Sequence, residues 1–149
     1  MADIKKINEQ LSIAPQLTPA EIDQLPELGF KSVLNLRSPA ENGFLTEEAQ
    51  QIEALGIAYT LTPVTLPSLN EALITQVVKQ IDNLPKPALI HCGSALRAGY
   101  MVILYQATKE GMTLDAAKQW SNELGFDMMR NPQLNQHFED YINKIIWRK

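Results

Sequence analysis

Hydrophobic positions occur along this chain in two kinds of segment: short apolar runs, and longer stretches in which apolar residues recur with helical spacing. The short runs are bounded by glycine, proline or polar residues, as β-strands usually are. The run at residues 87–90 is almost wholly apolar, which is typical of a central strand covered on both faces. Four strands are therefore predicted, over residues 11–14, 31–36, 57–62 and 87–90.

Longer stretches between and after these runs have the spacing of amphipathic helices. The first begins at Thr18, where Glu21 completes a capping box, and is expected to end at Gly29. Ser68 offers a second capping box, and Thr113 caps a later helix. The predicted helices cover about residues 18–29, 46–55, 68–84, 97–109, 113–124 and 134–147.

Strands that alternate with helices imply βαβ units with right-handed crossovers. We therefore predict an α/β fold, with a small, mainly parallel sheet of four to five strands flanked by helices, followed by C-terminal helices. In such sheets, ligands bind beyond the carboxyl ends of the strands. Cys92 follows the most apolar strand closely, so a functional site is expected at the carboxyl edge of the sheet.

Composition narrows the classes of function. The chain has 149 residues, which suits one domain, and its net charge of −4 provides no basic field to collect nucleic acid. No stretch resembles a signal peptide or is apolar over the length that a bilayer requires. A single cysteine cannot form an internal disulfide. We expect a cytoplasmic protein that binds neither nucleic acid nor membrane, and the sequence leaves its oligomeric state open.

The segment after the last predicted strand combines a tight loop with the start of a helix, at residues 91–97. Backbone N–H groups at a helix N-terminus converge and favour a bound anion. Arg97 adds a planar fork for oxygens of the same anion, and Cys92 in this field should exist largely as a nucleophilic thiolate. We predict that these two residues are catalytic. The rest of the anion-binding loop is His91, Gly93, Ser94, Ala95 and Leu96.

Other short matches accompany this loop: APQLTP at residues 14–19, GFKSVLNLR at 29–37, LGIAY at 55–59 and PV at 63–64. Together they resemble the phosphatase-like domain of beta-lactamase-hydrolase-like proteins, within the superfamily of cysteine-dependent tyrosine and dual-specificity phosphatases. The loop also resembles that of rhodanese sulfurtransferases. The resemblance covers about residues 4–110 of a single domain, with residues 111–149 as a helical extension. It implies a phosphatase-II-like fold and chemistry at Cys92 and Arg97.

Departures from the phosphatase pattern bear on the activity. Phosphatases of this superfamily place five residues between cysteine and arginine, whereas this loop has four, the spacing of rhodaneses. Ala95 and Ala98 replace a glycine and a hydroxyl residue that are common in the pattern, so the thiolate has one donor fewer. The segment expected to carry a general acid, residues 62–70, contains no carboxylate. Glu41 and Glu47 are candidate substitutes, although neither position matches.

Several other residues have both a functional and a structural interpretation. Arg37 follows the second strand and could reach the ligand crevice or be solvated in its loop. Glu41 could pair with Arg37 or act on substrate, although the solvated interpretation is favoured. No cluster of histidine, cysteine and carboxylate residues has metal-ligand spacing, so neither a metal nor a cofactor is predicted. Packing is expected for Trp120, His137 and Trp147, and it is favoured for residues 128–130 over the alternative that they rim the site.

Three functions are compatible with these residues. The leading one is sulfur transfer, in which Cys92 takes sulfane sulfur from a donor, holds it as a persulfide and passes it to an acceptor thiol. The second is phosphatase activity on a phosphomonoester or phosphotyrosine, through a phosphocysteine. The third is a non-catalytic regulatory module that binds anions. The expected partners are a small anionic or thiol substrate, or a phosphorylated protein.

Overall fold

The computed structural model describes residues 3–126 and 130–148, with side chains through residue 145 in the last helix. The chain forms two compact units. Unit 1 takes in the chain up to Thr65 together with Asn83–Ala98, and unit 2 takes in Leu66–Asp82 together with the chain from Gly99 onward. The segment with Cys92 therefore belongs to unit 1.

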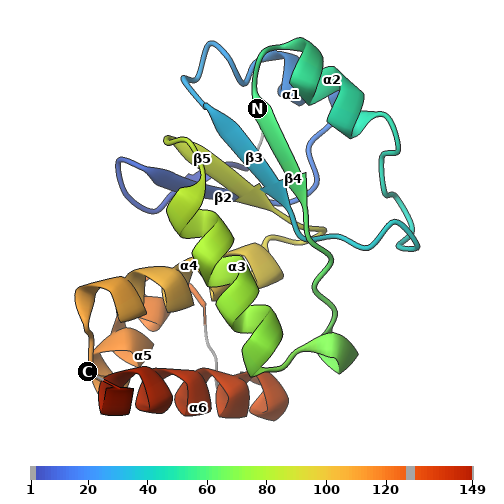
Figure 1. Ribbon diagram of the computed structural model, residues 1–149. Coiled ribbons are helices and arrows are strands. Elements are labelled where there is room, and N and C mark those ends of the chain that lie inside the picture. Colours follow the sequence, from blue (N-terminus) through green and yellow to red (C-terminus); the bar gives the residue numbers. More distant parts are fainter. Residues whose placement is uncertain (1–2, 127–129, 149) are drawn as a thin grey trace. The chain divides into compact units, whose positions relative to one another are not determined.

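Unit 1 contains a five-stranded sheet in the order β1-β2-β5-β3-β4 (Figure 1). All its neighbouring strands are parallel except β1, which runs antiparallel to β2. This confirms the predicted α/β fold with a mainly parallel sheet. The strands are β1 (Lys5–Lys6), β2 (Leu11–Ala14), β3 (Ser32–Asn35), β4 (Ala58–Leu61) and β5 (Ala88–His91).

The four predicted strands are all present, each within a residue or two of its expected bounds, and β5 is the central strand, as its apolar composition indicates. Its four residues are buried. The sequence does not predict β1, because two exposed lysines carry no strand periodicity. This strand pairs with β2 at the sheet edge, with Lys5 opposite Ile13.

Two helices, α1 (Pro19–Asp23) and α2 (Glu48–Ala54), lie wholly within unit 1. They contribute Ile22 and Ile52 to a hydrophobic cluster that also contains Val33 of β3 and Leu89 of β5. Burial of these side chains fixes both helices to one face of the sheet (Figure 1). The cluster consists of Ala14, Leu17, Ile22, Leu25, Phe30, Val33, Ile52, Ile57 and Leu89.

The capping box predicted at the start of α1 is present: the Thr18 side chain accepts from the Glu21 amide, and Glu21 accepts from the Thr18 amide. The helix is shorter than predicted, because it ends at Asp23 rather than near Gly29. Pro26 lacks the N–H that would bond to the Ile22 carbonyl, so the chain continues in turns. Gly29 ends these turns with φ of +87°.

Unit 2 contains α3 (Glu71–Asn83) up to Asp82, α4 (Leu96–Glu110) from Gly99, α5 (Leu114–Glu123) and α6 (Pro132–Arg148). Ser68 lies in a short 3-10 helix, Leu66–Ser68, and α3 begins three residues later than predicted. Asn70 caps the helix, its side chain accepting from the Leu73 amide at 2.8 Å. Thr113 caps α5 as predicted, accepting from the Ala116 amide.

Aromatic rings pack against α4 at two places in unit 2. The rings of Tyr100 and Phe138 join α4 to α6, with centroids 6.0 Å apart. A Cβ at Gly99 would lie 2.4 Å from the Phe126 ring, so only glycine permits this close approach to α4. The predicted packing of Trp120 and His137 is partial, because both are half-buried. Within the described part of the chain, no helix has both the length and the apolarity to cross a membrane.

Candidate active site

The parallel arrangement of β2, β5 and β3 brings three separate stretches of sequence to one edge of the sheet. His91 at the end of β5 is in register with Ala14 at the end of β2 and with Asn35 at the end of β3. The residues that follow these strands therefore gather at the carboxyl edge, as the sequence predicts. They include Gln16, Arg37 and Cys92.

Cys92 is fully buried and is the single cysteine of the chain. Its amide donates to the Ala14 carbonyl at 3.3 Å, which ties the start of the loop to β2. Its Sγ accepts from the Ala98 amide at 3.4 Å. An amide in the first turn of a helix stabilises negative charge on sulfur. The main chain of Ala98 therefore contributes a donor to the sulfur, although its side chain adds none.

The loop between Cys92 and α4 keeps a row of backbone donors open. None of the described residues accepts a hydrogen bond from the amides of residues 93–97. Ala95 has φ of +74°, a left-handed conformation that favours glycine and strains a residue with a Cβ. Such a turn before a helix is the geometry in which successive amides form an anion-binding concavity.

Arg97 is anchored on one side and open on the other. Its Nη1 and Nη2 donate to the two carboxylate oxygens of Glu41 at 2.7 and 2.8 Å, and Nη1 also donates to the Val64 carbonyl at 2.9 Å. Nε and the second Nη2 hydrogen have no oxygen acceptor among the described residues. The Glu41 hydrogen bond raises the pKa of Arg97, and the charge of Cys92 adds to this effect. One edge of the guanidinium therefore remains available to an anion.

Glu41 is held as a carboxylate. Its pKa is lowered to about 2, mainly by the hydrogen bond from Arg97; partial burial opposes this shift, while donation from the Ser38 amide at 2.7 Å and from Arg37 adds to it. A carboxyl group with this pKa is ionised near neutral pH and has no proton to donate to a leaving group. Glu41 is therefore a partner of Arg97 and unsuited to be the general acid that the sequence leaves open.

Arg37 is buried rather than solvated, with 6% of its surface exposed. Its guanidinium donates to Glu41, to the Gln16 side chain at 2.8 Å, and to the carbonyls of Asn42 and Gly43. These bonds fold the polar loop after β3 around the guanidinium and place Glu41 in front of Arg97. A Cβ on Gly93 would lie 3.5 Å from Arg97 Nη2 and 3.8 Å from Arg37 Nε, so both cations flank the loop.

His91 forms a buried pair with Glu48, a residue that the sequence analysis missed. His91 Nε2 donates to Glu48 Oε2 at 2.6 Å, and both side chains are at most 1% exposed. Glu48 also accepts from Gln16 at 2.7 Å and from Asn35 at 3.3 Å. The helical spacing could have indicated this role for Glu48, which lies one turn before Ile52 on the buried face of α2. A carboxylate buried there needs a polar partner.

The remaining candidates lie apart from these contacts. Ser94 is exposed, as is Leu96, at 48%. Glu47 is exposed at the start of α2 and makes no capping bond. Met128 and Met129 lie outside the described residues, while Arg130 is exposed. Among the residues described, no three His, Cys, Asp or Glu side chains are placed to hold a metal ion.

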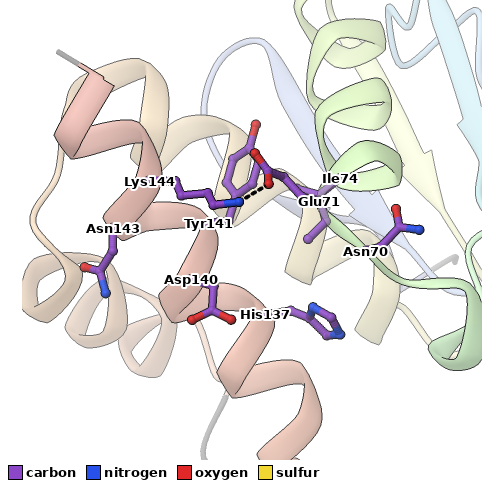
Figure 2. A pocket seen from close by; sticks show the side chains of 8 residues that line it. All are labelled: Asn70, Glu71, Ile74, His137, Asp140, Tyr141, Asn143 and Lys144. Atoms are coloured by element: carbon purple, nitrogen blue, oxygen red, sulfur yellow. Dashed lines mark hydrogen bonds and ion pairs between the residues drawn. The ribbon is translucent and has the colours of Figure 1, made fainter.

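Unit 2 has a groove of its own, shown in Figure 2, with a volume of about 700 Å³. It is lined by the start of α3 and by α6, and Glu71 and Lys144 form an ion pair across it. His137, expected only to pack, lies on its wall. None of the residues predicted for the anion site lines this groove.

Solved structures share this fold. A candidate phosphatase from Shewanella putrefaciens superposes with a TM-score of 0.83, at 17% identity, over 97% of this chain and 94% of its own. TpbA from Pseudomonas aeruginosa gives 0.77 at 13% identity, over 99% and 90% of the two chains. The PP-IP phosphatase SIW14 from Saccharomyces cerevisiae gives 0.72 at 20% identity, over 97% and 91%.

Sequence comparison identifies relatives of greater similarity. The beta-lactamase hydrolase-like protein of Agrobacterium fabrum is 30% identical over 83% of this chain, and that of Xylella fastidiosa is 31% identical over 85%. This chain spans only 29–30% of the length of those proteins. The phosphatase-like domain of such proteins, as a family, matches residues 3–109 here. Residues 3–109 thus place this chain in the family of phosphatase-like domains of beta-lactamase hydrolase-like proteins.

Proposed function

We propose that this protein is a cysteine-dependent phosphatase in which Cys92 is the nucleophile and Arg97 binds the phosphoryl group. The observation that carries the proposal is the combination of an anchored Arg97, with its Nε edge open, and the unpaired amides of residues 93–97. These donors lie in the loop that begins at the sulfur, and they suit the oxygens of a tetrahedral anion. The family relationship supports the same chemistry.

Two displacements at phosphorus complete the reaction. The Cys92 thiolate forms a bond to phosphorus while the bond from phosphorus to the ester oxygen breaks, and that oxygen leaves with the electron pair and takes a proton from solvent. Water then attacks the phosphocysteine, releasing phosphate and restoring the thiolate. Arg97 and the loop amides stabilise the charge on the non-bridging oxygens in both steps. The neighbour TpbA has been solved as a cysteine-to-serine variant in complex with pTyr, so a phosphotyrosine residue of a protein is one candidate substrate.

Sulfur transfer is the second candidate, and a specific observation favours it. Only four residues separate Cys92 from Arg97, and the segment at residues 62–70 carries no carboxylate to protonate a leaving oxygen. In this reaction the thiolate takes the outer sulfur of thiosulfate, sulfite leaves with the electron pair of the broken S–S bond, and an acceptor thiol or cyanide removes the sulfur from the persulfide. This route needs no proton donor for the leaving group.

One paired assay separates the two reactions. Hydrolysis of an aryl phosphate and transfer of sulfur from thiosulfate to cyanide are measured on the same preparation, with Cys92→Ser as the blank. Aryl phosphate turnover that disappears in Cys92→Ser supports the phosphatase, and Cys92-dependent sulfur transfer alone replaces it with the second candidate. If neither reaction depends on Cys92 but tungstate, an inert phosphate mimic, still binds, the loop is a non-catalytic anion-binding module.

A further inference from the structure

We propose that Gln16 is a positioning residue that couples the two ends of the anion-binding loop, an inference that rests on the anion chemistry proposed for Cys92 and Arg97. Gln16 lies two residues beyond the end of β2. Its amide donates to the Gly93 carbonyl at 3.2 Å, within the loop itself. Its side chain then bonds in two directions: Nε2 donates to Glu48 at 2.7 Å and to the neighbouring Leu17 carbonyl at 3.1 Å, while Oε1 accepts from Arg37 at 2.8 Å.

The first arm of this arrangement reaches the start of the loop. Gln16 Nε2 bonds to one oxygen of Glu48, and His91 Nε2 donates to the other at 2.6 Å. His91 directly precedes Cys92, and both it and Glu48 are excluded from water. In such surroundings a carboxylate keeps a fixed orientation only while each oxygen has a donor. Gln16 therefore helps to fix the residue before the nucleophile.

The second arm reaches the end of the loop. Gln16 Oε1 accepts from Arg37, whose Nε donates to Glu41, which in turn holds Nη1 and Nη2 of Arg97. Every link is a hydrogen bond to a charged group, the stronger class of such bonds. The open edge of Arg97 is therefore aimed by a chain of contacts that starts at Gln16.

Only a side chain of this length with both a donor and an acceptor can serve both arms. Glutamate in place of Gln16 would keep the acceptor for Arg37 but would set two carboxylates against each other at Glu48. Methionine would keep the volume and serve neither arm. The hydrogen bonds of the Gln16 side chain go to Leu17, Glu48 and Arg37 and not to the Cys92 sulfur or the open edge of Arg97, so its effect on a bound anion passes through other residues.

Tungstate binding, measured by titration calorimetry on the full chain, tests the proposal. Gln16→Met is expected to weaken tungstate binding roughly tenfold, the loss that corresponds to one charged hydrogen bond. Gln51→Met is the matched control, since the Gln51 side chain donates to Pro19 and Asp23 rather than to the loop. That variant is expected to bind tungstate within about twofold of the unmodified chain. Both are measured at a temperature where circular dichroism shows full folding.

Exchanging the amide of Gln16 and the carboxylate of Glu48 distinguishes an effect on positioning from an effect on the stability of the fold. Gln16→Glu alone is expected to weaken tungstate binding at least as much as Gln16→Met, through repulsion at Glu48. Adding Glu48→Gln returns a donor to the pair, because the amide introduced at position 48 can donate to position 16 and still accept from His91. The double variant is expected to recover tungstate affinity to within about threefold.

Failure of the anion chemistry and failure of the positioning role give different results. If the unmodified chain binds no tungstate, the anion chemistry proposed for Cys92 and Arg97 fails, and the role of Gln16 fails with it. If the unmodified chain binds tungstate and Gln16→Met binds it equally well, the positioning role alone is overturned. That role is also overturned if the double exchange recovers thermal stability without recovering tungstate affinity, since Gln16 would then matter only for folding.

Discussion

Glu41 and Arg97 meet end to end across 56 positions of sequence, with Oε2 to Nη1 at 2.7 Å and Oε1 to Nη2 at 2.8 Å. A guanidinium has five N–H donors in a fixed plane, so a carboxylate on its end sets the direction of the remaining edge. The pair is one-quarter exposed on each side, which leaves it close to solvent and to an incoming anion. Glu41 thus orients Arg97 without occupying the edge that would bind phosphate.

The first prediction is that Glu41→Gln lowers kcat/KM for aryl phosphates about tenfold, because a neutral amide holds Arg97 through weaker bonds. The loss should be the same for 4-nitrophenyl phosphate and for phenyl phosphate, which differ in the basicity of the leaving oxygen. Glu47→Gln is the control, since Glu47 is exposed and makes no capping bond. A loss confined to phenyl phosphate would show instead that Glu41 donates the proton.

The second prediction concerns stability and pH. The folded-state pKa of Glu41, about 2, lies below its ordinary value of 4.5, mainly because Arg97 donates to it. The stabilisation is therefore complete above about pH 5 and is lost as the pH falls toward 2. After allowance for solvent screening of a partly exposed pair, we expect about 1 kcal/mol. Urea unfolding of the unmodified chain and of Glu41→Gln should differ by this amount at pH 6, and the difference should shrink as the pH falls below the ordinary pKa of 4.5. A difference that grows on acidification would contradict the prediction.

Local chemistry explains which parts of the structure the sequence predicts well. The capping box at Thr18, the cap at Thr113 and the apolar β5 each depend on residues within one turn or one strand, so the pattern contains the whole signal. The anion-binding loop is local in the same sense. The end of α1 is less predictable, because the sequence offers two stop signals, Pro26 and Gly29. The proline comes earlier in the chain, so the helix ends before it reaches the glycine.

Contacts that bring distant segments together account for what the sequence does not predict. His91 and Glu48 are 43 positions apart, and Glu41 and Arg97 are 56 apart. The hydrophobic pattern of one sequence does not reveal such pairs, because their residues come close together only through the strand order β2-β5-β3. The residues next to Arg37 in sequence therefore do not show whether its side chain is buried or solvated. Its role in holding the loop becomes clear only from the four groups that accept its hydrogen bonds.

The third prediction uses the strain at Ala95. Replacing alanine by glycine at φ of +74° removes a clash of about 1–2 kcal/mol, offset by roughly 0.5–1 kcal/mol of added freedom in the unfolded chain. Ala95→Gly should therefore raise the free energy of unfolding by about 0.5 kcal/mol. Ala107→Gly in the interior of α4 should lower it by about 1 kcal/mol or more. Urea titrations of both variants check the opposite signs, and a destabilised Ala95→Gly would refute the strain at this position.

The fourth prediction is that Glu48→Ala destabilises the protein by about 3 kcal/mol, since it leaves the donors of His91, Gln16 and Asn35 without their shared acceptor. The neighbouring Glu47→Ala should change the free energy of unfolding by less than about 0.5 kcal/mol, because Glu47 is exposed. Chemical unfolding of both variants gives the comparison. Equal losses would mean that the buried pair contributes nothing beyond the helix in which Glu48 lies.

The last prediction concerns the selectivity of Cys92 for alkylating agents. Ordinary thiols react faster with iodoacetamide than with iodoacetate, because a negative reagent is repelled by the thiolate. Here the open amides of residues 93–97 and the free edge of Arg97 should bind the carboxylate of iodoacetate beside the sulfur, as oriented donors do for anions. Cys92 should therefore react faster with iodoacetate, and phosphate should protect it.

Mass spectrometry of the modified chain over time gives both alkylation rates. Arg97→Gln removes the fork while leaving the sulfur and the loop amides, so it should reverse the preference in favour of iodoacetamide. Lys86→Gln is the charge-matched control, since Lys86 donates to the Leu84 carbonyl and precedes β5, whereas the loop follows that strand. Faster reaction with iodoacetamide in the unmodified chain, without protection by phosphate, would mean that the loop does not gather anions at Cys92. If phosphate slows the alkylation of Cys92 in the unmodified chain but not in Arg97→Gln, the phosphate oxygens bind at the open edge of the Arg97 guanidinium.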